Sequence, residues 1–159
     1  MAKPLADGVI GSIDQAAELY HRLVVVVAPA GTGKTAVLRH VSERINAPLV
    51  NVNLELSRRM LDLTERQRSL QLPRLLSEIV NSKQGEVVLL DNIEVLFDVS
   101  LKQDPLRLLQ GVSRNRTIVA AWSGSAGGEY IVYATPGHPE YRRYSGRDLL
   151  IISLGLRYE

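Results

Sequence analysis

The apolar residues of this chain occur in short continuous runs separated by longer stretches in which polar residues intervene. Runs rich in β-branched and aliphatic residues suit strands that are buried on both faces of a parallel sheet. Such runs lie at residues 23–27, 86–91, 117–122 and 149–154, and an alternating run at residues 48–56 predicts one more strand.

Helical spacing fills the gaps between these runs. After the first run, apolar residues recur every three or four positions, at Val37, Leu38, Val41 and Ile45. Residues 57–82 are mostly helical in pattern, and we expect a break at Pro73 because proline does not fit a helix interior. Asp104 and Pro105 resemble an N-cap followed by proline at the first helical position, which predicts a helix to about Ser113. Strands that alternate with helices predict an α/β fold of three layers, a parallel sheet with helices on both faces and right-handed crossovers.

The other segments give weaker signals. Residues 1–11 are expected to be a mobile lead-in, and the capping-box pattern of residues 12–15 predicts a short helix to about Tyr20. The glycines within residues 124–128 predict a flexible, hairpin-like turn that leads into residues 129–134. Pro139 predicts a single helical turn within residues 136–144.

The first apolar run leads directly into a phosphate-binding motif. Its residues are Ala28-Pro29-Ala30-Gly31-Thr32-Gly33-Lys34-Thr35, which match the P-loop pattern G-x-x-x-x-G-K-[ST] with alanine for the first glycine. Gly31 and Gly33 permit a tight curl of backbone N–H groups around a phosphate. Lys34 supplies a charge for the β- and γ-phosphates, and the hydroxyl of Thr35 suits a Mg²⁺ ligand. The motif therefore predicts an ATP site with Mg²⁺.

A second nucleotide motif ends the run at residues 86–91. Asp91 follows four apolar residues and fits the Walker B role, in which a carboxylate at a strand end holds Mg²⁺. Asn92 stands where many P-loop ATPases carry glutamate, and asparagine can orient a water but cannot accept its proton. Glu94 could replace the missing glutamate as the base. In the alternative interpretation, Glu94 is a solvated acid in the first turn of a helix. Ser123, after the next strand, is either a sensor of the γ-phosphate or a turn residue.

Composition limits the classes of function. A chain of 159 residues with 45% hydrophobic and 23% charged residues predicts one soluble globular domain over residues 1–159. The absence of cysteine excludes disulfides and thiol catalysis, and a net charge of +2 is too small to argue for a nucleic-acid partner. Four arginines of the predicted helical region form either a basic patch or a solvated helix face. They are Arg58, Arg59, Arg66 and Arg68. Without a signal peptide or a spanning apolar run, we expect a cytoplasmic protein with no membrane partner.

The order of these elements resembles the core of AAA+ ATPases. In that family an arginine just before the last strand reaches the γ-phosphate of a neighbouring subunit, so the resemblance implies a homo-oligomer. Arg142 and Arg143 occupy that place here, and their alternative role is an ion pair with Glu140 or Asp148. The C-terminal helical lid of the family has no counterpart in a sequence that ends at Glu159.

Three less common segments are similar to the BrxF family, the small P-loop proteins of bacteriophage-exclusion (BREX) defence systems. They are Leu90 to Phe97, Ser113 to Trp122 and Pro136 to Arg142. This resemblance implies a bacterial protein that works beside other phage-defence proteins, several of which act on DNA. Direct contact with DNA is one alternative that this resemblance implies.

Three functions follow from these patterns. The first is an ATP-binding and ATP-hydrolysing AAA+-like component of a phage-defence complex. The second is a nucleotide-gated assembly module that binds ATP with little hydrolysis, which Asn92 and the absent lid favour. The third is a small-molecule kinase, whose acceptor pocket has no compact sequence signature.

Overall fold

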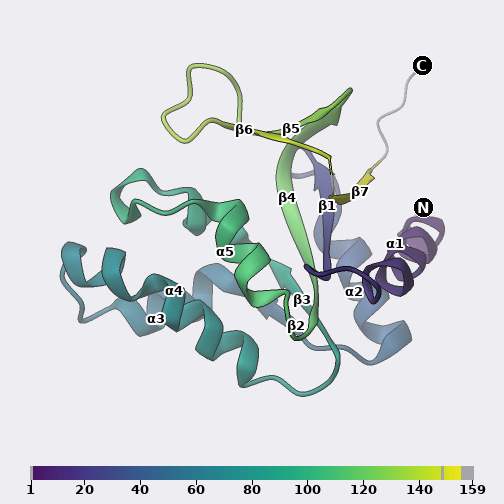
Figure 1. Cartoon of the computed structure of the whole chain (residues 1–159), viewed down its shortest axis with the longest axis horizontal. Helices are drawn as coiled ribbons and strands as arrows, with labels where there is room; N and C mark the ends of the chain where they lie inside the picture. Colours follow the sequence, from purple (N-terminus) through teal and green to yellow (C-terminus); the bar gives the residue numbers. More distant parts are fainter. Residues whose placement is uncertain (1, 148, 155–159) are drawn as a thin grey trace.

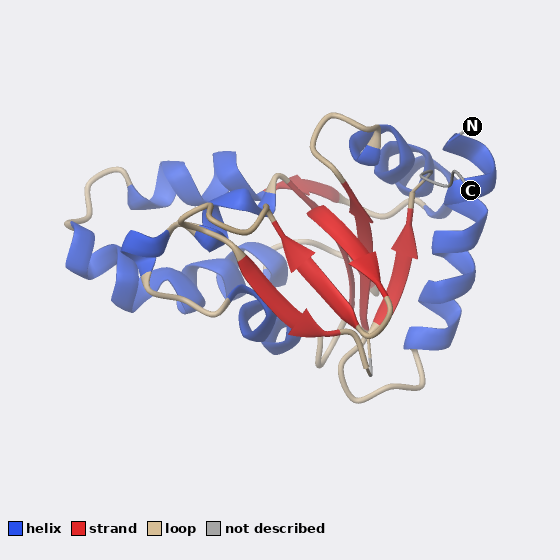
Figure 2. Ribbon diagram, turned by 90° about the horizontal axis from the view of Figure 1, so that it is seen from above, coloured by secondary structure: helices blue, strands red, loops and turns tan. Residues whose placement is uncertain are grey.

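The computed structural model describes residues 2–147 and 149–154, which form a parallel sheet covered by helices on both faces (Figures 1 and 2). The order of the parallel strands is β2-β3-β4-β1-β7. Their bounds are Leu49–Asn51 for β2, Val87–Asp91 for β3, Thr117–Gly127 for β4, Leu23–Ala28 for β1 and Leu150–Ser153 for β7. The expected α/β fold and its parallel sheet are thus confirmed.

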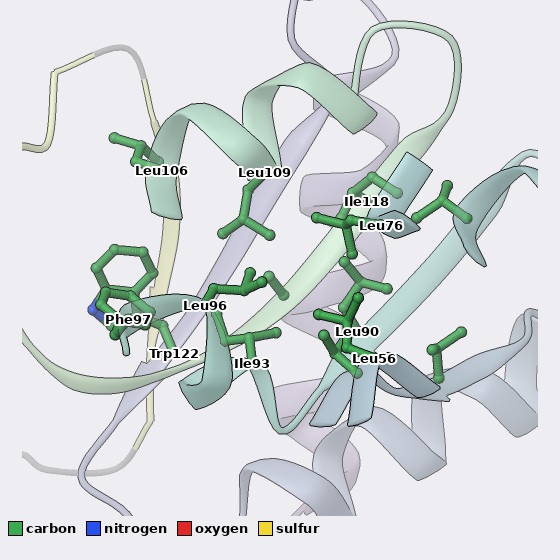
Figure 3. Packing of buried hydrophobic residues seen from close by; sticks show 14 of the residues in the cluster. Leu56, Leu76, Leu90, Ile93, Leu96, Phe97, Leu106, Leu109, Ile118 and Trp122 are labelled. Atoms are coloured by element: carbon green, nitrogen blue, oxygen red, sulfur yellow. The ribbon is translucent and has the colours of Figure 1, made fainter. Parts of the chain in front are cut away.

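Each face of the sheet has its own hydrophobic core, because successive strand residues point to opposite sides. On one face, α1 (Ala2–Ala16) and α2 (Lys34–Ile45) cover Val24 and Val26 of β1. On the other face, α3 (Val52–Met60), α4 (Glu65–Asn81) and α5 (Pro105–Val112) cover Val25 and Val27. Figure 3 shows this second core, in which side chains from the helices meet those of the strands. Full burial of one such aliphatic side chain contributes roughly 1.5–3 kcal/mol.

The parallel sheet has an antiparallel extension, of which the sequence predicted only the hairpin-like turn. β4 continues past the parallel part of the sheet and pairs with β5 (Tyr130–Tyr133), and β5 pairs with β6 (Arg142–Ser145), as Figure 1 shows above the sheet. The hairpin-like turn predicted near residues 124–128 exists, but most of that segment is strand. The prediction of a helical turn within residues 136–144 holds only as a single hydrogen-bonded turn around Pro139, in which the N–H of Tyr141 donates to the oxygen of His138 at 3.0 Å. No helix forms, and Arg142 and Arg143 are strand residues that pair with Tyr133 and Val132, respectively.

The prediction of a mobile lead-in and a helix that starts at Ser12 is also wrong for the described residues. Helix α1 begins at Ala2 and ends at Ala16. Small and aliphatic residues at helical spacing, Ala6, Val9, Ile13 and Ala16, pack against the sheet and α2. Gly8 and Gly11 lie on the exposed face of this helix.

Two further boundaries differ from the predictions. The strand predicted at residues 48–56 ends at Asn51, whose side-chain Oδ1 accepts a 3.0 Å hydrogen bond from the backbone N–H of Leu54 and starts α3. The break predicted at Pro73 does not occur, because Pro73 lies inside α4. A proline there leaves the carbonyl of Ser69 without its helical donor, and Nε2 of Gln103 donates to that oxygen at 2.7 Å.

Candidate functional site

The P-loop joins the end of β1 to the start of α2, at the edge of the sheet where the parallel strands end. Gly31 (φ 80°) and Gly33 (φ 97°) adopt the left-handed backbone conformation that the loop requires. Gly33 is the N-cap of α2, so the helix N-terminus and its free N–H groups face the loop. Such a terminus favours an anion.

Lys34 lies inside the loop rather than in solvent. Its Nζ donates to the backbone oxygens of Ala28 at 3.1 Å and Pro29 at 3.0 Å, and the residue is only 7% exposed. Burial lowers the pKa of Lys34 below its ordinary value, while the nearby carboxylates of Glu94 and Asp91 act in the opposite direction. A cation that is partly desolvated and held by two carbonyls is well placed to meet phosphate oxygens.

The two predicted Mg²⁺ ligands are neighbours. The hydroxyl of Thr35 donates to Oδ2 of Asp91 at 2.6 Å, although the residues belong to α2 and β3. Oδ1 of Asp91 accepts the backbone N–H of Asn92 at 3.0 Å, which fixes the carboxylate. Mg²⁺ prefers one or two protein oxygens supplemented by water and phosphate oxygens, and this pair fits that donor set. In the part of the chain that the structure describes, no group of three metal-ligating side chains is present.

Asn92 and Glu94 follow Asp91 but have different surroundings. Asn92 has a left-handed backbone (φ 53°) and is the N-cap of the 3₁₀ turn η1 (Ile93–Phe97) without a side-chain capping bond. Glu94 is half-buried, and its Oε2 accepts a 2.6 Å hydrogen bond from the hydroxyl of Ser123 on β4. The structure therefore brings Glu94 and Ser123 together, and neither is simply a solvated helix acid or a turn residue.

These side chains surround a cavity of about 390 Å³. It is lined by the P-loop and by the ends of β3 and β4, at Ala30, Gly31, Gly33, Lys34, Thr35, Asp91, Asn92, Glu94 and Ser123. The residues predicted for phosphate, metal and water thus share one cavity, apart from Ala28, Pro29 and Thr32 of the loop, which do not line it.

The two predicted arginines lie on β6, away from this cavity. Arg142 donates to the backbone oxygen of Gln103 at 2.7 Å, and the guanidinium of Arg143 lies 4.3 Å from the centre of the Tyr130 ring. Among the described residues no ion pair joins either arginine to Glu140, and Asp148 lies outside them. A role toward a neighbouring subunit stays a prediction.

The helix arginines do not form one continuous patch of free charge. Arg59 pairs with Glu55 at 2.8 Å, and Nε of Arg68 donates to the oxygen of Leu63 at 3.1 Å. Arg58 and Arg66 are exposed. This arrangement favours the interpretation as a solvated helix face.

Sequence reasoning missed a second cavity beside the first. Its wall includes Tyr133, Thr135, His138 and Glu140 from β5 and the loop that follows it. These residues have no motif spacing, so the sequence gives no signal that they meet Glu94. Only the antiparallel extension carries them to the P-loop.

Together, the strand order and the loop between β1 and α2 define a P-loop protein of the α/β class, whose loop suits a nucleoside triphosphate. The family model of the ATPase family associated with various cellular activities (AAA) matches residues 24–121, more than half of the chain, so the chain belongs to the AAA family.

Among solved structures, the chain is similar to the structure of C. elegans PCH-2, with 16% sequence identity and a TM-score of 0.49. The match covers 97% of this chain and 42% of that one. No curated protein sequence matches the chain. No helix within the described residues is both long and apolar enough to cross a membrane.

Proposed function

We propose that this protein binds ATP with Mg²⁺ and hydrolyses it as an AAA-type component of a bacterial phage-defence complex of the BREX type. The single observation that carries the ATP part is the cavity in which Lys34, the Thr35–Asp91 pair and Glu94 face one another. Lys34 would neutralise the β- and γ-phosphates, and the oxygens of Thr35 and Asp91 would hold Mg²⁺. When bound, Mg²⁺ neutralises charge that develops on the phosphates.

Glu94 is the best candidate for the general base. It lines the phosphate cavity, and its negative charge acts to raise the pKa of Lys34. The carboxylate of Glu94 therefore lies near the ammonium group that would bind the γ-phosphate. Asn92 lines the same cavity and can orient a water without accepting its proton. The hydroxyl of Ser123 fixes one carboxylate oxygen of Glu94 and leaves the other free to accept a proton.

The defence role is supported by the resemblance of three segments to the BrxF family. Residues of those segments border the two cavities: Asp91, Asn92 and Glu94 from the first, and His138 and Glu140 from the third. The second segment supplies residues 117–122 of β4, directly before Ser123 in the same strand. Two of the three segments thus contribute residues to the walls of the cavities, and this supports the proposal of a shared function there.

A second candidate function is a nucleotide-gated assembly module with little hydrolysis. It is favoured by Asn92, which lines the phosphate cavity but cannot accept a proton, and by Arg142, which is bonded to Gln103 of its own chain. In this case ATP would set the oligomeric state through β6 without rapid turnover.

Phosphate release with and without DNA, combined with light-scattering mass measurements with and without ATP, separates the two candidates. Hydrolysis that Lys34→Ala abolishes supports the ATPase, and an ATP-dependent mass without turnover supports the assembly module. For the defence role, phage plating on bacteria that carry the complete defence system with Lys34→Ala in this chain should rise to the level of bacteria without the system. Unchanged plating would contradict that role.

A further inference from the structure

The second cavity shares part of its wall with the phosphate cavity. It measures about 490 Å³, and Ala30, Glu94 and Ser123 line both spaces. The remainder of its wall is Pro29, Gly124, Ser125, Tyr133, Ala134, Thr135, His138 and Glu140. The Glu94–Ser123 pair is therefore the partition between a place for the γ-phosphate and a separate space beyond it.

The size of the second cavity decides what kind of group it suits. One water needs roughly 30 Å³ of liquid volume, far less than the space beyond Glu94. Pockets of roughly 300–1,000 Å³ are typical for small organic ligands. A hydrolytic water alone does not account for a space of this size next to the candidate base.

The chemistry of the wall narrows the ligand further. Glu94 and Glu140 bring two carboxylates, whereas the described residues that line the cavity include no lysine or arginine. Burial raises the pKa of Tyr133 above its ordinary value, and the negative charges of Glu94 and Glu140 raise it further. An anionic ligand is disfavoured here, and a cationic one is favoured.

The wall also carries hydrogen-bonding groups on a loop whose backbone is fixed. Nδ1 of His138 accepts the backbone N–H of Glu140 at 3.0 Å, which leaves Nε2 as the donor of the neutral ring. The N–H of His138 donates to the oxygen of Thr135, also at 3.0 Å. Ser125 and Thr135 also line this space, and side chains with hydroxyls suit a ligand that carries hydroxyl groups.

We infer that the second cavity is an acceptor site that binds a small cationic alcohol, such as an amino alcohol or amino sugar, and that the γ-phosphoryl group of ATP is transferred to its hydroxyl. The inference rests on the proposed ATP site. The acceptor oxygen attacks the γ-phosphorus, the bond from that phosphorus to the β–γ bridging oxygen breaks, and ADP leaves with the electron pair. The proton of the hydroxyl passes to the carboxylate of Glu94 and the product is a phosphomonoester.

The test compares ADP with inorganic phosphate formed by the complete chain in the presence of Mg²⁺ATP. The cationic probes are ethanolamine and glucosamine, and glycerol and glucose are their neutral controls. Hydrolysis yields equal amounts of ADP and phosphate, whereas transfer yields more ADP than phosphate and a phosphomonoester that phosphorus NMR identifies. We expect the excess of ADP with a cationic probe and not with its neutral control.

Variants of the residues that line this cavity test whether the excess of ADP over phosphate arises there. Glu140→Gln should reduce transfer at low acceptor concentration by about tenfold or more, because one charge-assisted contact is lost, while ATP affinity stays unchanged. Thr135→Val, a second and nearly isosteric change, should also reduce transfer. Glu129→Gln removes the same charge from the same hairpin outside the cavity and should behave like the wild type.

A fluorescent-ATP titration distinguishes the two ways of failing. If ATP binds and is hydrolysed but ADP equals phosphate with every probe, the acceptor site is refuted and the ATPase stands. An excess of ADP that Glu140→Gln and Thr135→Val leave unchanged also refutes this cavity as its source. If ATP does not bind, both proposals fail.

Discussion

The hydroxyl of Ser123 lies 2.6 Å from Oε2 of Glu94 and donates a hydrogen bond to it across 29 positions of sequence. This contact joins β4 to the turn after β3 and holds the carboxylate of Glu94 in the wall that the two cavities share. Glu94 follows the Walker B aspartate, Asp91, by three residues. Its carboxylate can accept a proton in the phosphate cavity, which the amide of Asn92 cannot do. The first prediction concerns this acid.

Glu94→Gln should abolish most ATP turnover while leaving ATP affinity intact. The amide keeps the size of the side chain but cannot accept a proton, and a general base contributes about 10²- to 10⁴-fold in rate. Phosphate release and nucleotide titration on the same preparation check both parts. Glu78→Gln, an exposed acid paired with Arg74 on α4, is the control. Turnover at the wild-type rate would show that Glu94 is not the base.

Asn92→Glu restores the residue that many P-loop ATPases carry, and we expect it to raise turnover per folded molecule. The substitution should also lower the free energy of unfolding, because residue 92 has a φ of 53°. A left-handed backbone costs an ordinary residue about 1–2 kcal/mol, and asparagine tolerates it better. Urea unfolding should therefore show a free energy of unfolding lower by about 1 kcal/mol. Asn92→Gly, which has no such penalty, should not show this loss.

Lys34→Ala should weaken ATP binding severely. Its ammonium is the cation of the phosphate cavity, and a charge-assisted hydrogen bond contributes roughly 1.5–3 kcal/mol, about 10- to 150-fold in affinity. Titration with a fluorescent ATP analogue measures the change. Lys83→Ala removes the same charge at a distant site, where Lys83 lies near Glu55. Equal affinities for wild type and Lys34→Ala would remove Lys34 from the site.

Gln103→Ala should destabilise the protein because it leaves the partly buried oxygen of Ser69 without a donor. An unsatisfied buried acceptor costs about 1–3 kcal/mol. Pro73→Ala supplies a backbone N–H that can donate to the same oxygen, so Gln103→Ala should cost less in that background. Urea unfolding of the two single variants and the double variant forms the cycle. Additive free-energy changes would contradict the link between Pro73 and Gln103.

The arginines of β6 should act between subunits. Arg143 is exposed and its contact is to the Tyr130 ring, whereas Arg142 is held by Gln103. We expect ATP to promote an oligomer and Arg143→Ala to reduce hydrolysis far more than binding, with Arg142→Ala also lowering stability. An arginine that reaches a neighbour's γ-phosphate contributes about 10³- to 10⁵-fold in rate.

Mixing supplies the control for this prediction. Arg143→Ala and Lys34→Ala subunits should regain part of the activity when combined, because each contributes the half that the other lacks. A protein that stays monomeric at saturating ATP while it hydrolyses ATP would rule out an arginine supplied by a neighbour.

The sequence by itself determined the P-loop, the strands of the parallel sheet and the positions of Thr35 and Asp91. Those features depend on local chemistry: glycines at fixed spacing, β-branched runs, and a helix that starts where the loop ends. A parallel sheet places the carboxyl ends of its strands at one edge, and the start of α2 after β1 meets the end of β3 there, although β4 lies between the two strands.

Only the tertiary structure decided the rest. Residues 142–145 are a strand because β5 offers a partner for their backbone, and Pro73 stays inside a helix because Gln103 satisfies the carbonyl that the proline leaves free. The same extension carries Thr135, His138 and Glu140 to Glu94. Each of these outcomes depends on a contact between residues far apart in the chain, and the preferences of a local segment contain no information about a distant partner.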